Sequence, residues 1–149
     1  MLPYIFRGKR KDNGEWAEGY YAEFHDRPVV PRENSCHIFE PREDAHFLGS
    51  SIGGFWRIVD RETVGQFIGI NDKTGKKIFE GDVVKTKYGR LCIVEPFDSP
   101  NYLGWDLTPV NTIENCLHTR APDSYDIWKP KHLEVVGNIY DNPEYLKGD

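Results

Sequence analysis

Short runs of β-type residues, separated by turn residues at close intervals, constrain this chain more than any other feature of its sequence. From about residue 55 to residue 95, runs rich in Val, Ile and Phe alternate with clusters of Asn, Asp and Gly. No stretch carries the apolar 3.6-residue period of a packed helix. Several short strands with regularly spaced turn signals are typical of a small sandwich or barrel. The sequence therefore predicts an all-β fold of short antiparallel strands.

The centre of the chain gives the clearest strand predictions. These strands are expected at 55–59, 64–70, 78–79, 83–86 and 91–94. Asn, Asp and Gly, which tolerate turn geometry, separate them at 71–75, 81–82 and 88–90. Residues 63–95 are expected to form much of a small SH3-like or partly open barrel. A further strand near 133–140 is expected to close onto it.

The rest of the chain is expected to add shorter features to this barrel within one domain, 1–149, since this length suits a single compact domain. Asn13-Gly14 supplies the backbone angles of a tight turn and predicts an N-terminal hairpin over 4–24. Residues 27–54 are broken by Pro and Gly and predict a variable loop region, with short strands near Cys36–Phe39. A barrel-like core is expected over 55–140, and Pro143 favours a short C-terminal helical turn over 141–146. Residues 111–117 carry the only helical pattern inside the core, and Tyr102 begins one more expected strand.

Composition supports the β prediction and limits the partners. Aromatic residues make up 13% of the chain, and they fit a half-buried pleated surface well. The formal net charge of −5 argues against a protein that coats nucleic acid by bulk electrostatics, although a local basic surface remains compatible with it. The three cysteines cannot all pair within the chain, and neither a signal peptide nor a membrane span is predicted. We therefore expect a cytoplasmic protein with no membrane partner.

Three blocks of sequence stand out: YIFRGKR, NGEW and EGYY within 4–21, then TVGQFIGI, Asp72, Gly75-Lys76 and IFEGDVV within 63–84, and VGNIYDNPE at 136–144. Together they resemble the YopX-like family of phage and prophage proteins. The matched residues are mainly glycines, aromatic residues and turn residues, which is typical of a shared backbone rather than a shared active site. The resemblance implies an all-β protein encoded in a phage or prophage genome, located in the bacterial host's cytoplasm and assembled as an oligomer. It places no catalytic role on any residue.

Two groups of residues offer enzyme chemistry, and neither has the context that the chemistry needs. Gly49-Ser50-Ser51-Ile52-Gly53 has the spacing of a hydrolase nucleophile elbow, but a strand-like run follows it where a helix is required. His, Cys, Asp and Glu gather between Glu23 and His46 without a metal-site spacing, and interleaved arginines can pair with the carboxylates. A serine- or metal-dependent hydrolase is therefore the third hypothesis for function. No catalytic residue, metal ligand or cofactor is predicted.

Positive charge near the barrel supports a second hypothesis, a single-stranded nucleic-acid-binding protein. The basic side chains expected on adjacent strands are Lys73, Lys76, Lys77, Lys85, Lys87 and Arg90. Phe79, Tyr88 and Tyr102 are the expected stacking residues, since small β-barrels bind single strands with basic grooves and aromatic platforms. Glu80 and Asp82 dilute this charge. An ordinary charged sheet face is the alternative interpretation.

The leading hypothesis is a non-enzymatic accessory protein that acts by protein–protein contact or self-assembly. Its expected partners are further copies of itself or an unknown phage or host protein. The four tryptophans (16, 56, 105 and 128) are expected to lie mostly in the core, because a large aromatic side chain buries much apolar surface. Trp128, between Ile127 and Lys129, is the tryptophan expected to anchor an interface.

Overall fold

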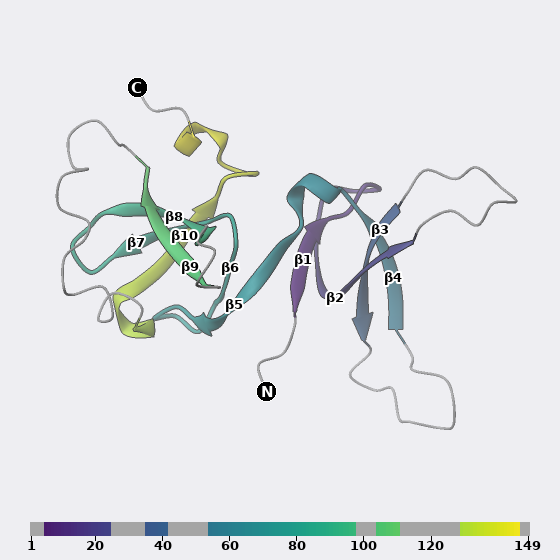
Figure 1. Ribbon diagram of the computed structural model, residues 1–149, viewed down its shortest axis with the longest axis horizontal. Helices are drawn as coiled ribbons and strands as arrows, with labels where there is room; N and C mark the ends of the chain where they lie inside the picture. The colour runs from purple at the N-terminus through teal and green to yellow at the C-terminus, as the bar shows by residue number, and fades with distance from the viewer. Residues whose placement is uncertain (1–4, 25–34, 42–53, 98–103, 111–128, 147–149) are drawn as a thin grey trace, which may run out of the picture. The chain divides into compact units, whose positions relative to one another are not determined.

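The computed structural model describes residues 5–24, 35–41, 54–97, 104–110 and 129–146 (Figure 1). They form ten β-strands and three short 3-10 segments, and every ladder between the strands is antiparallel. The prediction of an all-β fold of short antiparallel strands is confirmed, and in the described residues the sheets stay open rather than closing into a barrel. The chain divides into two compact units, Met1–Gln66 and Phe67–Asp149. The expectation of one domain over 1–149 stays a prediction.

The first unit is a meander of four strands in the order β4-β3-β2-β1. The strands are β1 (Phe6–Lys9), β2 (Trp16–Phe24), β3 (Ser35–Pro41) and β4 (Gly54–Val59). The N-terminal hairpin is present: Gly14 has a φ of 72°, and the Asn13 side chain accepts a hydrogen bond of 3.0 Å from the Glu15 N–H. Gly65 and Gln66, at the start of β5 (Gly65–Asn71), pair with β1.

This meander curls until its last strand returns to its first. The Lys11 N–H donates to the Ile58 carbonyl at 3.0 Å, and the Asp60 N–H donates to the Lys9 carbonyl at 2.8 Å. The curl buries one face of the sheet around Ala17, Cys36, Ile38 and Val59. The approach is close enough that a Cβ on Gly8 would lie 2.9 Å from the Val59 Cβ, so a larger residue would push the strands apart.

Strand β4 therefore belongs to the first unit, whereas the sequence placed it at the start of the barrel-like core over 55–140. Its partner is β3, with Trp56 opposite Phe39 and Val59 opposite Cys36. Strand β3 itself occupies the place of the short strands expected near Cys36–Phe39. Segments 25–34 and 42–53, from the expected loop region, lie outside the described residues.

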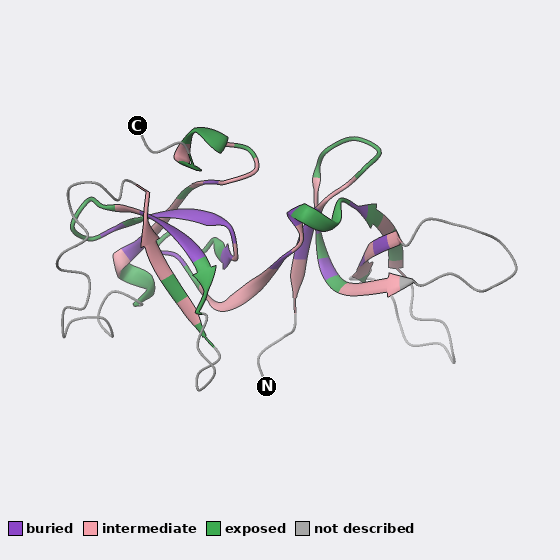
Figure 2. Ribbon diagram, turned by 45° about the horizontal axis from the view of Figure 1, so that its top comes forward, coloured by how far each residue is buried: buried purple, intermediate pink, exposed green. Residues whose placement is uncertain are grey.

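The second unit is built on four strands in the order β10-β7-β8-β9, with β6 (Lys77–Phe79) paired to β5. They are β7 (Asp82–Thr86), β8 (Leu91–Pro96), β9 (Trp105–Pro109) and β10 (Leu133–Asn138). Strand β10 pairs with β7, as predicted for the C-terminal strand. Figure 2 shows β7 largely buried and β8 buried at its middle, with an exposed end. The core packs Ile78, Val84, Cys92, Val94 and Leu133 together.

A turn after β10 fastens the C-terminal end of the chain to the second unit. The Asn138 side-chain oxygen accepts hydrogen bonds from the N–H groups of Tyr140 and Asp141 at 3.0 and 2.8 Å. The Ile139 N–H donates to the carbonyl of Gly81, which has a φ of 83°. A 3-10 segment, η3 (Pro143–Leu146), follows in the place expected for a helical turn. The helix considered at 111–117 lies outside the described part of the chain.

No helix in the described ranges is long and apolar enough to cross a membrane.

The carboxylate of Asp72 links the turn between β5 and β6 to strand β10. One oxygen accepts from the Thr74 N–H, the Thr74 hydroxyl and the Lys76 N–H at 2.8, 2.6 and 3.0 Å. The other oxygen accepts from the Val135 N–H at 2.9 Å, although Val135 is far away in sequence. Burial of Asp72 acts to raise its pKa, but these hydrogen bonds to the charged form outweigh it and hold the pKa below its ordinary value.

Replacing this carboxylate is expected to destabilise the protein in a pH-dependent way. In Asp72→Asn, one oxygen becomes an amide donor facing an N–H group, and we expect a loss of about 2 kcal/mol in the free energy of unfolding at neutral pH. The folded-state pKa is lowered, so the wild-type advantage is full above the ordinary carboxyl pKa and is lost as the pH falls through the folded-state value. Denaturant unfolding from pH 7 to pH 2 measures this difference.

The control is Asp106→Asn, which removes an exposed carboxylate in the same unit. It is expected to change stability by less than about 0.5 kcal/mol. An Asp72→Asn deficit that stayed constant down to pH 2 would contradict the role given to the ionised carboxylate.

Candidate functional site

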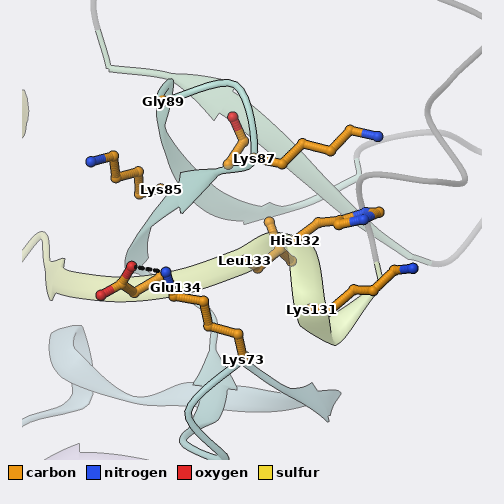
Figure 3. Close-up of a pocket in the computed structure, with 9 residues that line it drawn as sticks. Lys73, Lys85, Lys87, Gly89, Lys131, His132, Leu133 and Glu134 are labelled. Carbon is orange, nitrogen blue, oxygen red and sulfur yellow. Dashed lines mark ion pairs between the residues drawn. The ribbon is translucent and has the colours of Figure 1, made fainter.

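A groove of about 250 Å³ lies on the second unit (Figure 3). It is lined by Lys73, Lys85, Thr86, Lys87, Gly89, Lys131, His132, Leu133 and Glu134. These residues come from the β5–β6 turn, the end of β7, the β7–β8 turn, the 3-10 segment η2 (Pro130–His132) and the start of β10. Four lysines and a histidine thus share one concave surface.

Strand pairing brings these distant segments together. In the β10–β7 ladder Leu133 lies opposite Thr86 and Glu134 lies opposite Lys85. The Lys73 N–H donates to the Leu133 carbonyl at 2.9 Å, which places the β5–β6 turn beside the start of β10. Segment η2 begins with a proline, which suits a first helical position, and directly precedes β10. The groove therefore depends on the backbone ladder rather than on contacts between its own side chains.

The electrostatics of the groove are dominated by ammonium groups. Glu134 is the single carboxylate among the described residues that line it, and it pairs with the Lys73 ammonium at 2.5 Å. Both side chains are partly exposed, so this pair is expected to add little stability. Lys87, Lys131 and His132 extend toward the same side in Figure 3, while Lys85 extends in another direction. The lining provides hydrogen-bond donors and positive charge, which are the groups that bind phosphate or another anion.

Half of the basic residues predicted from the sequence line this groove. Lys73, Lys85 and Lys87 do, whereas Lys76, Lys77 and Arg90 are exposed residues that do not line it. Sequence reasoning missed Lys131 and His132. The signal that could have found them was the expected strand near 133–140, because residues directly before a strand that pairs with β7 must lie near the end of β7.

The three residues expected to stack on bases differ in their exposure and in whether the structure describes them. Phe79 is 2% exposed and packs against Phe67 with ring centroids 5.8 Å apart, so its prediction as a stacking residue is wrong. It is a core residue because β6 turns its side chain inward. Tyr102 lies outside the described residues. Tyr88 is 61% exposed in the turn between β7 and β8, with the Lys87 ammonium 4.9 Å from its ring centroid.

A second surface, on the outward face of the first unit, is apolar. Tyr20, Phe39 and Trp56 lie opposite one another on β2, β3 and β4, and they form a cross-strand aromatic row. The Phe39 and Trp56 ring centroids are 4.8 Å apart. Tyr20, Trp56 and Ile58 are each more than half exposed. We call Tyr20, Phe39, Trp56 and Ile58 the apolar face.

The apolar face corrects the expectation for the tryptophans. Trp56 was expected in the core, but it is 52% exposed, because it points to the face of β4 opposite to that of the buried Val59. A cavity of about 440 Å³ runs beside it, between the β1–β2 turn and β4, and Lys11 and Arg57 contribute to its lining. Trp128, predicted as an interface anchor, lies outside the described residues.

The described residues contain no group of three His, Cys, Asp or Glu side chains arranged to hold a metal ion. Ser51 and most of the metal-ligand types between Glu23 and His46 fall in segments that the structure does not describe.

Together, the open antiparallel sheets and the lysine-lined groove define a small all-β protein with one concave basic surface. Comparison with known families then places it: the chain matches the YopX protein family over residues 5–147 and belongs to that family. A similar solved structure is the crystal structure of protein EF1440 from Enterococcus faecalis, with 20% sequence identity, a TM-score of 0.47 and 99% of each chain covered. No curated protein matches the chain.

The sequence blocks that resemble the family have structural roles in the second unit. Gly81, from the IFEGDVV block, accepts the hydrogen bond of Ile139, from the VGNIYDNPE block. Asp82 pairs in register with Asn138, which organises the turn after β10. These blocks therefore build the ladder that carries the groove, and the lysines of the groove lie outside them.

Proposed function

We propose that this chain is a non-enzymatic phage or prophage accessory protein of the host cytoplasm, and that its basic groove binds nucleic acid through the phosphates. The observation that carries the proposal is that Lys73, Lys85, Lys87 and Lys131 line one concave surface. The single carboxylate among the described lining residues is paired with Lys73, and the Lys87 and Lys131 side chains extend toward the same side (Figure 3). Ammonium groups bind phosphate as point charges with several donors each.

The charge balance of the whole chain makes this local excess informative. The chain carries a formal net charge of −5, yet the groove lining carries four lysines against one glutamate. Neutralising phosphates with lysines releases counterions, which gives affinity without any base-specific contact. A groove of this kind favours an anionic polymer that lies across it.

Charge reversal in the groove is expected to weaken binding and to reduce its salt dependence. For Lys85→Glu with Lys131→Glu, each lost phosphate contact lowers the slope of log affinity against log salt by about 0.7 for a single strand. In the double variant the magnitude of this slope should therefore fall by about 1.4, and the affinity at low salt should fall about tenfold or more. Fluorescence anisotropy of a labelled oligonucleotide, titrated from low to moderate salt, measures both quantities.

A control with the same change in net charge separates the groove from bulk electrostatics. Lys76→Glu with Lys77→Glu alters two exposed lysines of the same unit that do not line the groove. This variant is expected to keep most of the wild-type affinity and slope. Equal losses in the two double variants would show that the groove is not the binding site.

Protein–protein contact, with self-association first, is the second candidate function. The apolar face favours it, because three of its side chains, one on β2 and two on β4, expose half or more of their surface. Aromatic residues at exposed positions are enriched in the energetic centres of interfaces. Strand β4 also stands at the end of the strand order in the first unit, and sheet edges invite pairing between copies.

Self-association through this face is expected to resist salt and to depend on Trp56 and Ile58. Wild-type protein at tens of micromolar should scatter light as a multimer at both low and high salt, since apolar contacts are not screened. Trp56→Ala with Ile58→Thr should shift the mass toward the monomer. Tyr88→Ala, which removes an exposed ring from the other unit, is the control and should leave the mass unchanged. If the wild-type protein is a monomer at both salt concentrations, self-association through the apolar face is refuted.

A further inference from the structure

We infer that Tyr88 is a base-stacking platform at the edge of the groove, so that the groove takes single-stranded rather than duplex nucleic acid. The inference rests on the proposed function, because it assumes that the groove binds phosphates. Tyr88 has the largest exposed fraction among the large apolar and aromatic side chains of the described residues, at 61%. Its neighbours in sequence, Lys87 and Gly89, both line the groove.

The turn that carries Tyr88 is closed by three hydrogen bonds. The Gly89 N–H donates to the Thr86 carbonyl at 2.9 Å, and the Thr86 N–H donates to the Arg90 carbonyl at 2.8 Å. The Arg90 N–H also donates to the Thr86 hydroxyl at 3.3 Å. Gly89 has a φ of 78°, which only glycine adopts easily, and this angle closes the turn directly after the tyrosine. The backbone that carries the ring is thus held in place, with little further backbone entropy to lose on binding.

Charge and ring are placed together at this point. The Lys87 ammonium lies 4.9 Å from the centroid of the Tyr88 ring. A nucleotide whose base stacks on the ring would therefore have an ammonium group within reach of its phosphate. Single-strand binding surfaces combine these two elements, an aromatic ring for the base and a cation for the backbone. In a duplex the bases are already stacked and paired, so the ring would have nothing to contact.

Stacking on one ring tolerates any base, because every base offers a π-face. The described lining beside Tyr88 offers ammonium donors and Gly89 rather than amide side chains that would read a base edge. We therefore assign the groove to single strands of any sequence.

The test uses the full chain and three labelled probes of equal length, about ten nucleotides, which is within the site sizes of small single-strand-binding barrels. The probes are oligothymidylate, an abasic oligomer with the same phosphates, and a duplex. Wild-type protein should bind oligothymidylate about fivefold or more tightly than the abasic oligomer. Tyr88→Ala should lower the affinity for oligothymidylate to the abasic level and leave the abasic affinity unchanged. Tyr88→Phe, which keeps the ring, should behave as wild type.

The outcomes separate this inference from the proposal on which it rests. Equal wild-type affinity for oligothymidylate and the abasic oligomer, with no effect of Tyr88→Ala, would overturn the stacking role and leave phosphate binding in place. Preference for the duplex would overturn it as well. Absence of binding to all three probes would refute the proposed function itself. An equal loss of oligothymidylate and abasic binding in Tyr88→Ala would also count against stacking, because removal of a base contact cannot weaken a ligand that has no bases.

Discussion

The Asp72 carboxylate is the interaction on which the second unit most depends. It accepts four hydrogen bonds, three from its own turn and one from Val135 on β10, and so joins two segments that lie 63 residues apart in sequence. Without it, the turn and the strand would each leave partly buried N–H groups to be satisfied elsewhere, and each would lose a hydrogen bond. The same junction sets the groove, because the next residue, Lys73, donates its N–H to Leu133 at the start of β10. A residue that does not line the groove thus determines where the lining residues lie.

The family motifs extend the same arrangement. The turn after β10 is organised by Asn138, and the β6–β7 turn is opened by Gly81 with its positive φ; the two meet through the hydrogen bond from Ile139. Each of these residues serves the backbone, since each either supplies a side-chain acceptor for main-chain N–H groups or adopts an angle that a larger residue resists. The groove lysines contribute their backbones to this frame, as the Lys73 N–H bond to Leu133 and the pairing of Lys85 with Glu134 show. The frame can therefore stay constant while the side chains around the groove differ. Resemblance in these motifs therefore identifies the family without identifying a ligand.

The strands were predictable from the sequence because they are local features. Asn13-Gly14 fixes a hairpin within a few residues, and the Val-rich runs around β7 and β8 are bounded by turn residues on both sides. The assignment of β4 was not predictable in the same way, because its partner is chosen by pairing across a long connection and not by its own residues. The prediction of the groove lining was incomplete for the same reason. Lys73, Lys85 and Lys87 are close in sequence and were grouped together, whereas Lys131 and His132 are brought near them only by the β10–β7 ladder. Phe79 and Trp56 show that the buried face of a strand can also be hard to predict. Strand β6 has three residues and β4 is an edge strand, and neither alternates clearly enough between apolar and polar residues to reveal which side faces the core.

The acidic total of the chain and the basic groove act together on any polyanion. Over distances longer than the screening length, about 8 Å at physiological salt, a ligand far from the groove meets little net attraction from a chain of formal charge −5. Only a phosphate that enters the groove comes close enough to its ammonium groups to gain from them. Such a distribution disfavours extended coating of nucleic acid, for which positive charge must cover a large surface. It favours a short strand segment held in one place, and an exposed ring on the turn beside the groove is useful only to a ligand held in that way.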